Sequence, residues 1–130
     1  MQPSHEISRL IEIMARLRTP DTGCPWDLEQ THVTLKKYLI KEAYELIEAI
    51  DQEDREGMIE ELGDVLLQPM MHAEYAQRRG EFDLPLIAQQ QAEKLVRRHP
   101  HVFGDKVANT AEEVLANWDR VKRAEKERHS

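Results

Sequence analysis

Two pairs of acidic residues have the spacing best suited to chemistry. Glu42 and Glu45 occur in the run KEAYELIEAI, and Glu61 and Asp64 occur in EELGDVLLQ. Residues three apart lie on one face of a helix, about 60° apart in projection, so each pair directs two carboxylates into one volume. Four converging carboxylates repel one another unless a cation lies among them. Oxygen ligands suit Mg²⁺, or Mn²⁺ in its place, and such ions share their coordination sphere with substrate phosphates. The pattern therefore indicates phosphoryl or nucleotidyl chemistry.

Both pairs lie beside the apolar stripe of a predicted helix, away from the fully solvated side. If the two helices form an antiparallel hairpin, their acidic edges face each other at the rim of the core. His72 falls on the same edge, where a structural histidine is the more common role. The competing interpretation is that the acids are ordinary solvated helix surface. The apolar stripes are Leu35, Leu39, Ala43, Leu46 and Ile50 in one helix, and Met58, Leu62, Val65 and Leu66 in the other.

Apolar periodicity of the helical type predicts the elements that position these acids. No segment has the alternation of a strand, so the sequence predicts an all-α fold, a bundle of about five helices. The predicted helices run from Ser4 to Arg18, from Thr31 or Thr34 to about Asp51, from about Glu53 to Arg79, from about Leu84 to Arg98, and onward from Asn109–Thr110.

Several residues mark where these helices begin, end or bend. Ser4 is predicted to cap the first helix, and Thr110 with Glu113 forms a predicted capping box for the last one. The segment Thr19–Asp27 contains two prolines and a glycine, so we expect it to be irregular. Pro69 falls inside the third helix, where it removes one hydrogen bond and predicts a kink.

Length and composition bound the class of protein. The chain has 130 residues, which favours a single domain over 1–130, with a strongly charged tail from about residue 120. The net charge of −7 argues against a nucleic-acid-coating protein, which needs a basic face. With one cysteine, Cys24, no intrachain disulfide can form, and no apolar run is long enough for a membrane span. We therefore expect a cytoplasmic protein.

The chain resembles the MazG-type nucleoside triphosphate pyrophosphohydrolases from about Ile7 to Lys122. The resemblance lies in GCPWDLEQTHVTLKKYLIKEAYELIEAI, in EELGDVLLQ, and in the later runs KLVRRHPHVFGD and EEVLANWDRVK. It implies an all-α bundle completed by a second subunit, hence a homodimer or homotetramer. It also implies hydrolysis of NTPs or dNTPs to the monophosphate and pyrophosphate, as in nucleotide-pool housecleaning. The implied Mg²⁺ ligands are Glu42, Glu45, Glu61 and Asp64.

The resemblance also implies nucleotide contacts in the later segments, at Lys94, Arg98, Trp118 and Lys122. Lys94 and Arg98 are four apart, so both cations share a helix face and can grip a polyphosphate. Trp118 can stack on a base while Lys122, one turn later, meets phosphate. The competing interpretations are a core anchor for Trp118 and a solvated charge run for Lys122.

Two residues depart from the family pattern. Lys41 stands where an acid is frequent, and it lies four residues before Glu45, with which it can pair. Pro69 stands where an apolar helix former is more usual. A non-catalytic nucleotide- or metal-binding module is therefore the alternative to an enzyme, and a bundle with solvated acids is a third hypothesis. A di-iron oxidase fits poorly, because no histidine follows Glu42 or Glu61 by three.

Overall fold

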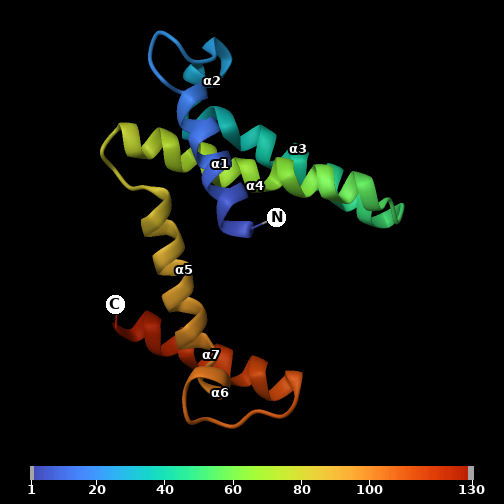
Figure 1. Cartoon of the computed structure of the whole chain (residues 1–130). Helices are drawn as coiled ribbons and strands as arrows, with labels where there is room; N and C mark the ends of the chain where they lie inside the picture. The colour runs from blue at the N-terminus through green and yellow to red at the C-terminus, as the bar shows by residue number, and fades with distance from the viewer. Residues whose placement is uncertain (1, 129–130) are drawn as a thin grey trace. The chain divides into compact units, whose positions relative to one another are not determined.

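The computed structural model describes residues 2–128, and these residues form helices joined by short connections (Figure 1). No strand occurs in this described range, which confirms the predicted all-α class. None of the helices in the same range is long and apolar enough to cross a membrane. The helices are α1 (Pro3–Leu17), α2 (Pro25–Glu29), α3 (His32–Asp51), α4 (Arg55–Arg78), α5 (Leu84–Arg98), α6 (Pro100–Phe103) and α7 (Ala111–Arg128).

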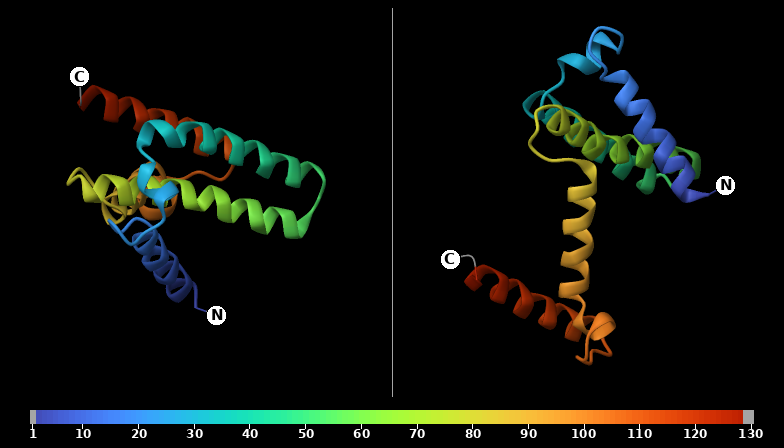
Figure 2. Two further views of the ribbon diagram at one scale, coloured as in Figure 1. Left: turned by 90° about the horizontal axis from the view of Figure 1, so that it is seen from above. Right: turned by 60° about the vertical axis from the view of Figure 1, so that its left-hand side comes forward.

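The chain divides into two units, Met1–Leu84 and Pro85–Ser130, and each is described by itself. The single domain over 1–130 stays a prediction. In the first unit, α3 and α4 run antiparallel along each other, and α1 packs against α4 (Figures 1 and 2). One buried residue from each of these helices meets in the core, with Tyr38 and Leu67 packed against them. The three are Met14, Leu35 and Met71.

A three-residue connection joins α3 to α4 and fixes the register of the hairpin. The backbone N–H of Glu53 donates to the Ile50 carbonyl, and that of Asp54 donates to the Ala49 carbonyl, at 3.0 Å each. These two bonds close a Schellman motif, in which Glu53 takes the left-handed position with φ of 53°. Asp54 then caps α4 by accepting a hydrogen bond from the Gly57 N–H. The tight connection forces the two helices to lie antiparallel.

The other ends of the same two helices are also closed by local hydrogen bonds. Thr31 and Thr34 form a reciprocal capping box at the start of α3, and of the two predicted starts, Thr31 and Thr34, Thr31 is the capping residue. After α4, Gly80 takes φ of 73°, and its N–H donates to the Gln77 carbonyl. The predicted stop at Arg79–Gly80 is confirmed.

Three prolines begin helices, and this corrects the sequence prediction in three places. Pro3 opens α1 after Gln2, so Ser4 is inside the helix and the predicted Ser4 cap was wrong. Pro25 opens α2, so the segment Thr19–Asp27 is not irregular to its end. The helix α5 ends at Arg98 as predicted, and Pro100 opens α6, which was not predicted. The fixed φ of proline suits the first helical position, where its missing N–H has no role.

The apolar stripes are only partly buried. Leu35 has no exposed surface, yet Leu62, predicted to point inward, is 53% exposed. Leu39, Ile50 and Leu66 are also exposed. Periodicity identified the apolar face of each helix, but among the described residues much of that face is exposed.

The helix α4 continues through Pro69 without interruption. The predicted kink there stays a prediction, because helix continuity does not measure a bend. In the second unit, α5 is followed by α6 and by α7 (Figure 2). The Thr110 hydroxyl accepts from the Glu113 N–H, as predicted, while the Glu113 carboxylate accepts from the N–H of Asn109 instead of that of Thr110.

Candidate active site

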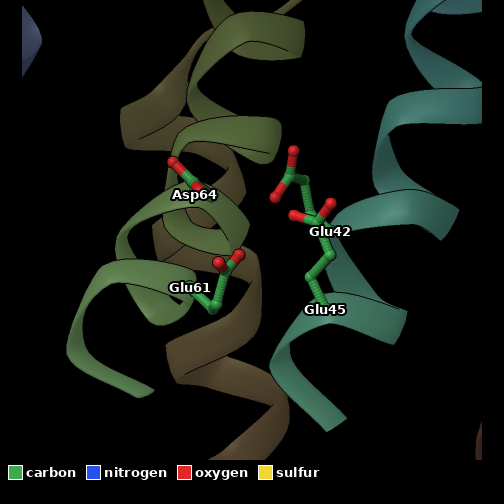
Figure 3. Close-up of side chains that lie close together, drawn as sticks. All are labelled: Glu42, Glu45, Glu61 and Asp64. Carbon is green, nitrogen blue, oxygen red and sulfur yellow. The ribbon is translucent and has the colours of Figure 1, made fainter. Parts of the chain in front are cut away.

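The four predicted acids come together between the two helices of the hairpin (Figure 3). Glu42 and Glu45 project from α3, and Glu61 and Asp64 project from α4 toward them. One carboxylate oxygen from each residue lies within 4.8 Å of the oxygens of the other three. We call these four residues the carboxylate cluster. Their spacing of three on each helix and the antiparallel register together produce this convergence.

Two of these acids hold carboxylate oxygens away from solvent with no partner among the described residues. They are the Oε2 atoms of Glu42 and Glu61. Burial raises the pKa of Glu42, and its neighbours Glu45 and Asp64 raise it further. Burial, followed by the charge of Glu45, raises the pKa of Glu61 to about 7. Oxygens that are buried, unpaired and mutually repelling fit a divalent cation, which would neutralise and coordinate them.

Lys41 is the nearest cation to the cluster that the structure records. Its Nζ lies 3.7 Å from a carboxylate oxygen of Glu45 and 3.9 Å from one of Glu42. The predicted pairing of Lys41 with Glu45 is thereby confirmed. The Lys41 side chain is 61% exposed, while that of Glu42 is 13% exposed, so the ammonium group lies at the outer rim.

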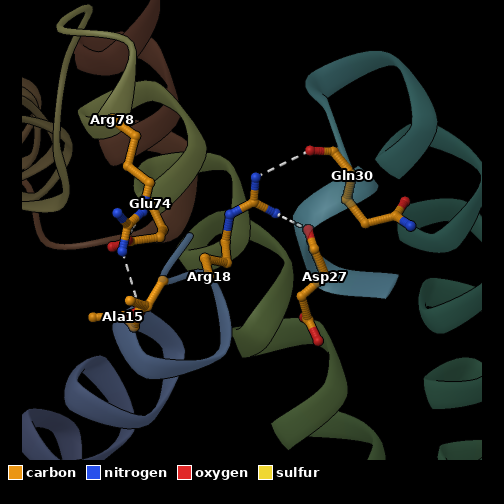
Figure 4. Close-up of polar contacts among 7 residues, drawn as sticks. Ala15, Arg18, Asp27, Gln30, Glu74 and Arg78 are labelled. Atoms are coloured by element: carbon orange, nitrogen blue, oxygen red, sulfur yellow. Dashed lines mark hydrogen bonds and ion pairs between the residues drawn. The ribbon is translucent and has the colours of Figure 1, made fainter. Parts of the chain in front are cut away.

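Arg18, which the sequence prediction did not single out, ties the segment before α3 to α1 (Figure 4). It is buried, and its guanidinium donates to the carbonyl of Asp27 at 2.5 Å and to that of Gln30 at 3.1 Å. Arg78 on α4 donates to the Ala15 carbonyl at 3.1 Å. These bonds hold α1, α2 and α4 together, and so they position the start of α3.

His72 is engaged with another histidine. Its Nδ1 lies 2.7 Å from Nδ1 of His32, and the two rings are stacked with centroids 5.0 Å apart. The His32 ring is also perpendicular to the Tyr75 ring, with centroids 4.7 Å apart, and stacked with the Phe82 ring at 5.9 Å. The Nε2 of His32 lies 3.9 Å from a Glu81 oxygen. These contacts favour the structural role expected for His72.

In the second unit, Arg98 and Trp118 come together. The guanidinium carbon of Arg98 lies 5.4 Å from the centre of the Trp118 ring, and the His99 ring meets that indole edge-on. Glu125 pairs with Arg98 at 3.1 Å and with Arg97 at 2.5 Å. Trp118 therefore contacts residues of its own unit, and Glu125 forms ion pairs with both arginines.

Lys94 lines a hollow of about 490 Å³ along α5, together with Arg97. Arg98, the predicted companion of Lys94, has its charged partner Glu125 on α7. The sequence prediction missed Arg97 and Glu125, although the doublet Arg97–Arg98 was the available signal. The roles of Lys94, Arg98, Trp118 and Lys122 stay predictions.

Fold and cluster together define an all-α protein with a carboxylate site of the kind that holds hard cations. The MazG nucleotide pyrophosphohydrolase domain matches residues 30–103. The chain belongs to this family. The matched range contains the whole carboxylate cluster, Lys94 and Arg98, and it ends before Trp118.

Two known proteins and one solved structure are similar to the chain. Over 94% of the present chain, the sequence is 52% identical to the uncharacterized protein YabN of Bacillus subtilis. Over 97% of the present chain, it is 47% identical to the nucleoside triphosphate pyrophosphohydrolase of Escherichia coli K12. It spans 25% of the former protein and 49% of the latter. Among solved structures, a mazG-related protein from Thermotoga maritima is 33% identical, with a TM-score of 0.75, covering 89% of this chain and 98% of that one.

Proposed function

We propose that this protein hydrolyses nucleoside triphosphates, ribo- or deoxyribonucleotides, to the monophosphate and pyrophosphate in a Mg²⁺-dependent reaction. The observation that carries the proposal is the carboxylate cluster, in which four acids from one helical hairpin converge and two hold buried, unpaired oxygens. Family membership supports the reaction class, and the Escherichia coli relative carries the name of that activity. Nucleotide-pool housecleaning is the proposed role.

The cluster residues have defined roles in this proposal. Glu42, Glu45, Glu61 and Asp64 would hold Mg²⁺, for which Mn²⁺ can substitute. When bound, such an ion would offset charge on the triphosphate and favour attack by water. Water attacks the α-phosphorus and gives up a proton to a carboxylate of the cluster or to solvent, while the bond to the bridging oxygen breaks and pyrophosphate leaves with that oxygen. Glu42 and Glu61 would offer their buried Oε2 atoms to the ion, while the Glu45 side chain is 39% exposed.

We propose nucleotide contacts from the second unit. Lys94 and Arg98 offset phosphate charge, and Arg97 joins them because it lines the same hollow as Lys94. Trp118, which is half-buried beside Arg98 and His99, contacts the base, and Lys122 meets phosphate.

The exposed apolar residues of the hairpin support a homodimer or homotetramer. A single chain leaves large side chains of both helices uncovered, and a second copy of the hairpin would bury them. They include Leu39, Ile40, Ile47, Ile50, Ile59, Leu62 and Leu66. We further propose a cytoplasmic location, where nucleoside triphosphates are plentiful, and no nucleic-acid partner, because the net charge is −7.

A product analysis tests the proposed reaction. The protein is incubated with a panel of NTPs and dNTPs in Mg²⁺, and monophosphate, diphosphate, phosphate and pyrophosphate are resolved. We expect monophosphate and pyrophosphate in equal amounts. Glu42→Gln and Glu61→Gln should each lower the rate at least about 100-fold, as expected when a charged group acting on the transition state is lost. The matched control is Glu60→Gln, on the exposed side of α4, which should leave the rate unchanged.

Normal turnover in Glu42→Gln would overturn the assignment of the cluster. Binding of nucleotide without release of pyrophosphate would instead identify the non-catalytic module. The pairing of Lys41 with Glu42 and Glu45 is the observation that favours this second candidate, because an internal cation lowers the charge available to metal.

A further inference from the structure

Lys41 lies at the rim of the carboxylate cluster but is not fixed there. Its Nζ is 3.7 Å from Glu45 and 3.9 Å from Glu42, distances longer than those of an ordinary charged hydrogen bond. At 61% exposure, its long side chain can take other rotamers at little cost. Electrostatic attraction to the carboxylates of Glu42 and Glu45 therefore keeps the ammonium group nearby, but no short hydrogen bond fixes its position.

We propose that Lys41 is a substrate-binding residue, which leaves the carboxylates of Glu42 and Glu45 and contacts the triphosphate when a metal–nucleotide complex occupies the cluster. This inference rests on the proposed function and adds a phosphate ligand that the sequence prediction did not assign.

Charge balance explains why Lys41 would exchange its carboxylate partners for phosphate. Without metal, Lys41 is the positive group recorded against the cluster, and it offsets part of the repulsion among the acids. A divalent cation bound by the same acids neutralises them more completely, so their attraction for Lys41 falls. A triphosphate placed on that cation brings new negative charge to the rim, where the ammonium already lies. Lys41 then gains more from phosphate than from Glu45.

The exchange predicts effects of opposite sign for one substitution. Removal of the Lys41 charge should strengthen metal binding to the protein alone, because a competing cation is lost. The same removal should weaken nucleotide binding in saturating metal, because a phosphate contact is lost. A fixed counterion would give the first effect without the second, and a solvated surface lysine would give neither.

Titration calorimetry on Lys41→Met measures both effects. Mn²⁺ is titrated into the protein alone, and α,β-methylene-ATP, which resists cleavage at the α-phosphorus, is titrated in saturating Mg²⁺. We expect about two- to fivefold tighter Mn²⁺ binding, since an exposed ion pair is weak, and about five- to tenfold weaker binding of the analogue. Lys41→Arg should retain most of the analogue affinity.

The matched control is Lys37→Met, one turn earlier on α3, where the ammonium lies over the Tyr38 ring. It removes the same charge and should change neither affinity more than twofold. Unchanged melting temperatures establish that each variant is folded. Analogue affinity within twofold of the parent protein in Lys41→Met would overturn the proposal for Lys41. Loss of Mn²⁺ binding in Glu42→Gln tests the metal site separately, so failure of Lys41 and failure of the proposed function are distinguishable.

Discussion

The Nδ1 atoms of His32 and His72 lie 2.7 Å apart, so the two rings connect the start of α3 to the C-terminal third of α4. A hydrogen bond between two such atoms needs one protonated nitrogen and one free lone pair. At least one ring is therefore neutral at its Nδ1. Two doubly protonated rings would place N–H against N–H and would separate.

Loss of the His72 ring should reduce the acid sensitivity of the protein. Burial, and then the neighbouring His32, lowers the pKa of His72 below its ordinary value of 6.5. The folded state thus binds fewer protons there than the unfolded chain, and stability falls as the pH drops below about 6.5 through the folded pKa. Urea denaturation at pH 7.5 and 5.5 should show a smaller difference for His72→Gln than for the parent protein. His5→Gln, on the exposed face of α1, is the control and should retain the full difference.

Glu61 has the opposite dependence on pH. Its pKa rises from 4.5 to about 7 in the folded protein, chiefly because of burial. Its contribution to stability is fully present below pH 4.5 and is lost as the pH rises through about 7. Mg²⁺ binds the deprotonated form, so the rise in melting temperature with Mg²⁺ should be larger at pH 8 than at pH 6. Glu61→Gln should abolish most of this rise, and an equal rise at both pH values would contradict the assignment.

Arg18→Met should destabilise the first unit by about 2–4 kcal/mol. The change removes two charge-assisted hydrogen bonds, so the Gln30 carbonyl loses the donor recorded for it, and the Asp27 carbonyl keeps only the N–H of Gln30. Arg16→Met removes the same type of side chain from the exposed face of α1 and should cost less than about 0.5 kcal/mol. Urea denaturation measures both, and equal losses would show that the buried guanidinium has no special role.

Glu53→Gly should stabilise the hairpin by about 0.5–1 kcal/mol, because glycine takes a left-handed conformation without steric cost. Glu53 holds that conformation with φ of 53°, and Gly80 holds it at the end of α4 with φ of 73°. Gly80→Ala should therefore lower stability by about 1 kcal/mol. Gln52→Gly, where the backbone is right-handed helical, serves as the control and should not stabilise. Thermal denaturation gives the sign of each change.

The carboxylate cluster could be predicted from the sequence because the two features that form it are encoded locally. Spacing of three places each pair of acids on a face, and the capping residues Thr31 and Gly80 mark the ends of the hairpin. Both signals are encoded within one or two helical turns.

The features that the sequence prediction missed depend on context that local patterns do not contain. Pro25 was interpreted as a sign of irregular structure and Pro100 as the end of a helix, although proline also suits a first helical position. In the sequence, Arg18 is a charged residue at the end of a predicted helix, and no local pattern marks it as buried. Its burial depends on carbonyls that α2 presents from another part of the chain, and α2 itself had not been predicted.

The three-residue connection between α3 and α4 has a kinetic consequence. Glu42 and Asp64 are only 22 positions apart in the sequence, so their meeting closes a short loop at low entropic cost. Helical proteins with mainly local contacts fold within microseconds to milliseconds. We expect the hairpin to be among the first parts to form, with the four acids of the carboxylate cluster already assembled. A cation could then bind during folding, and its release would be governed by opening of the hairpin, which needs less energy than global unfolding.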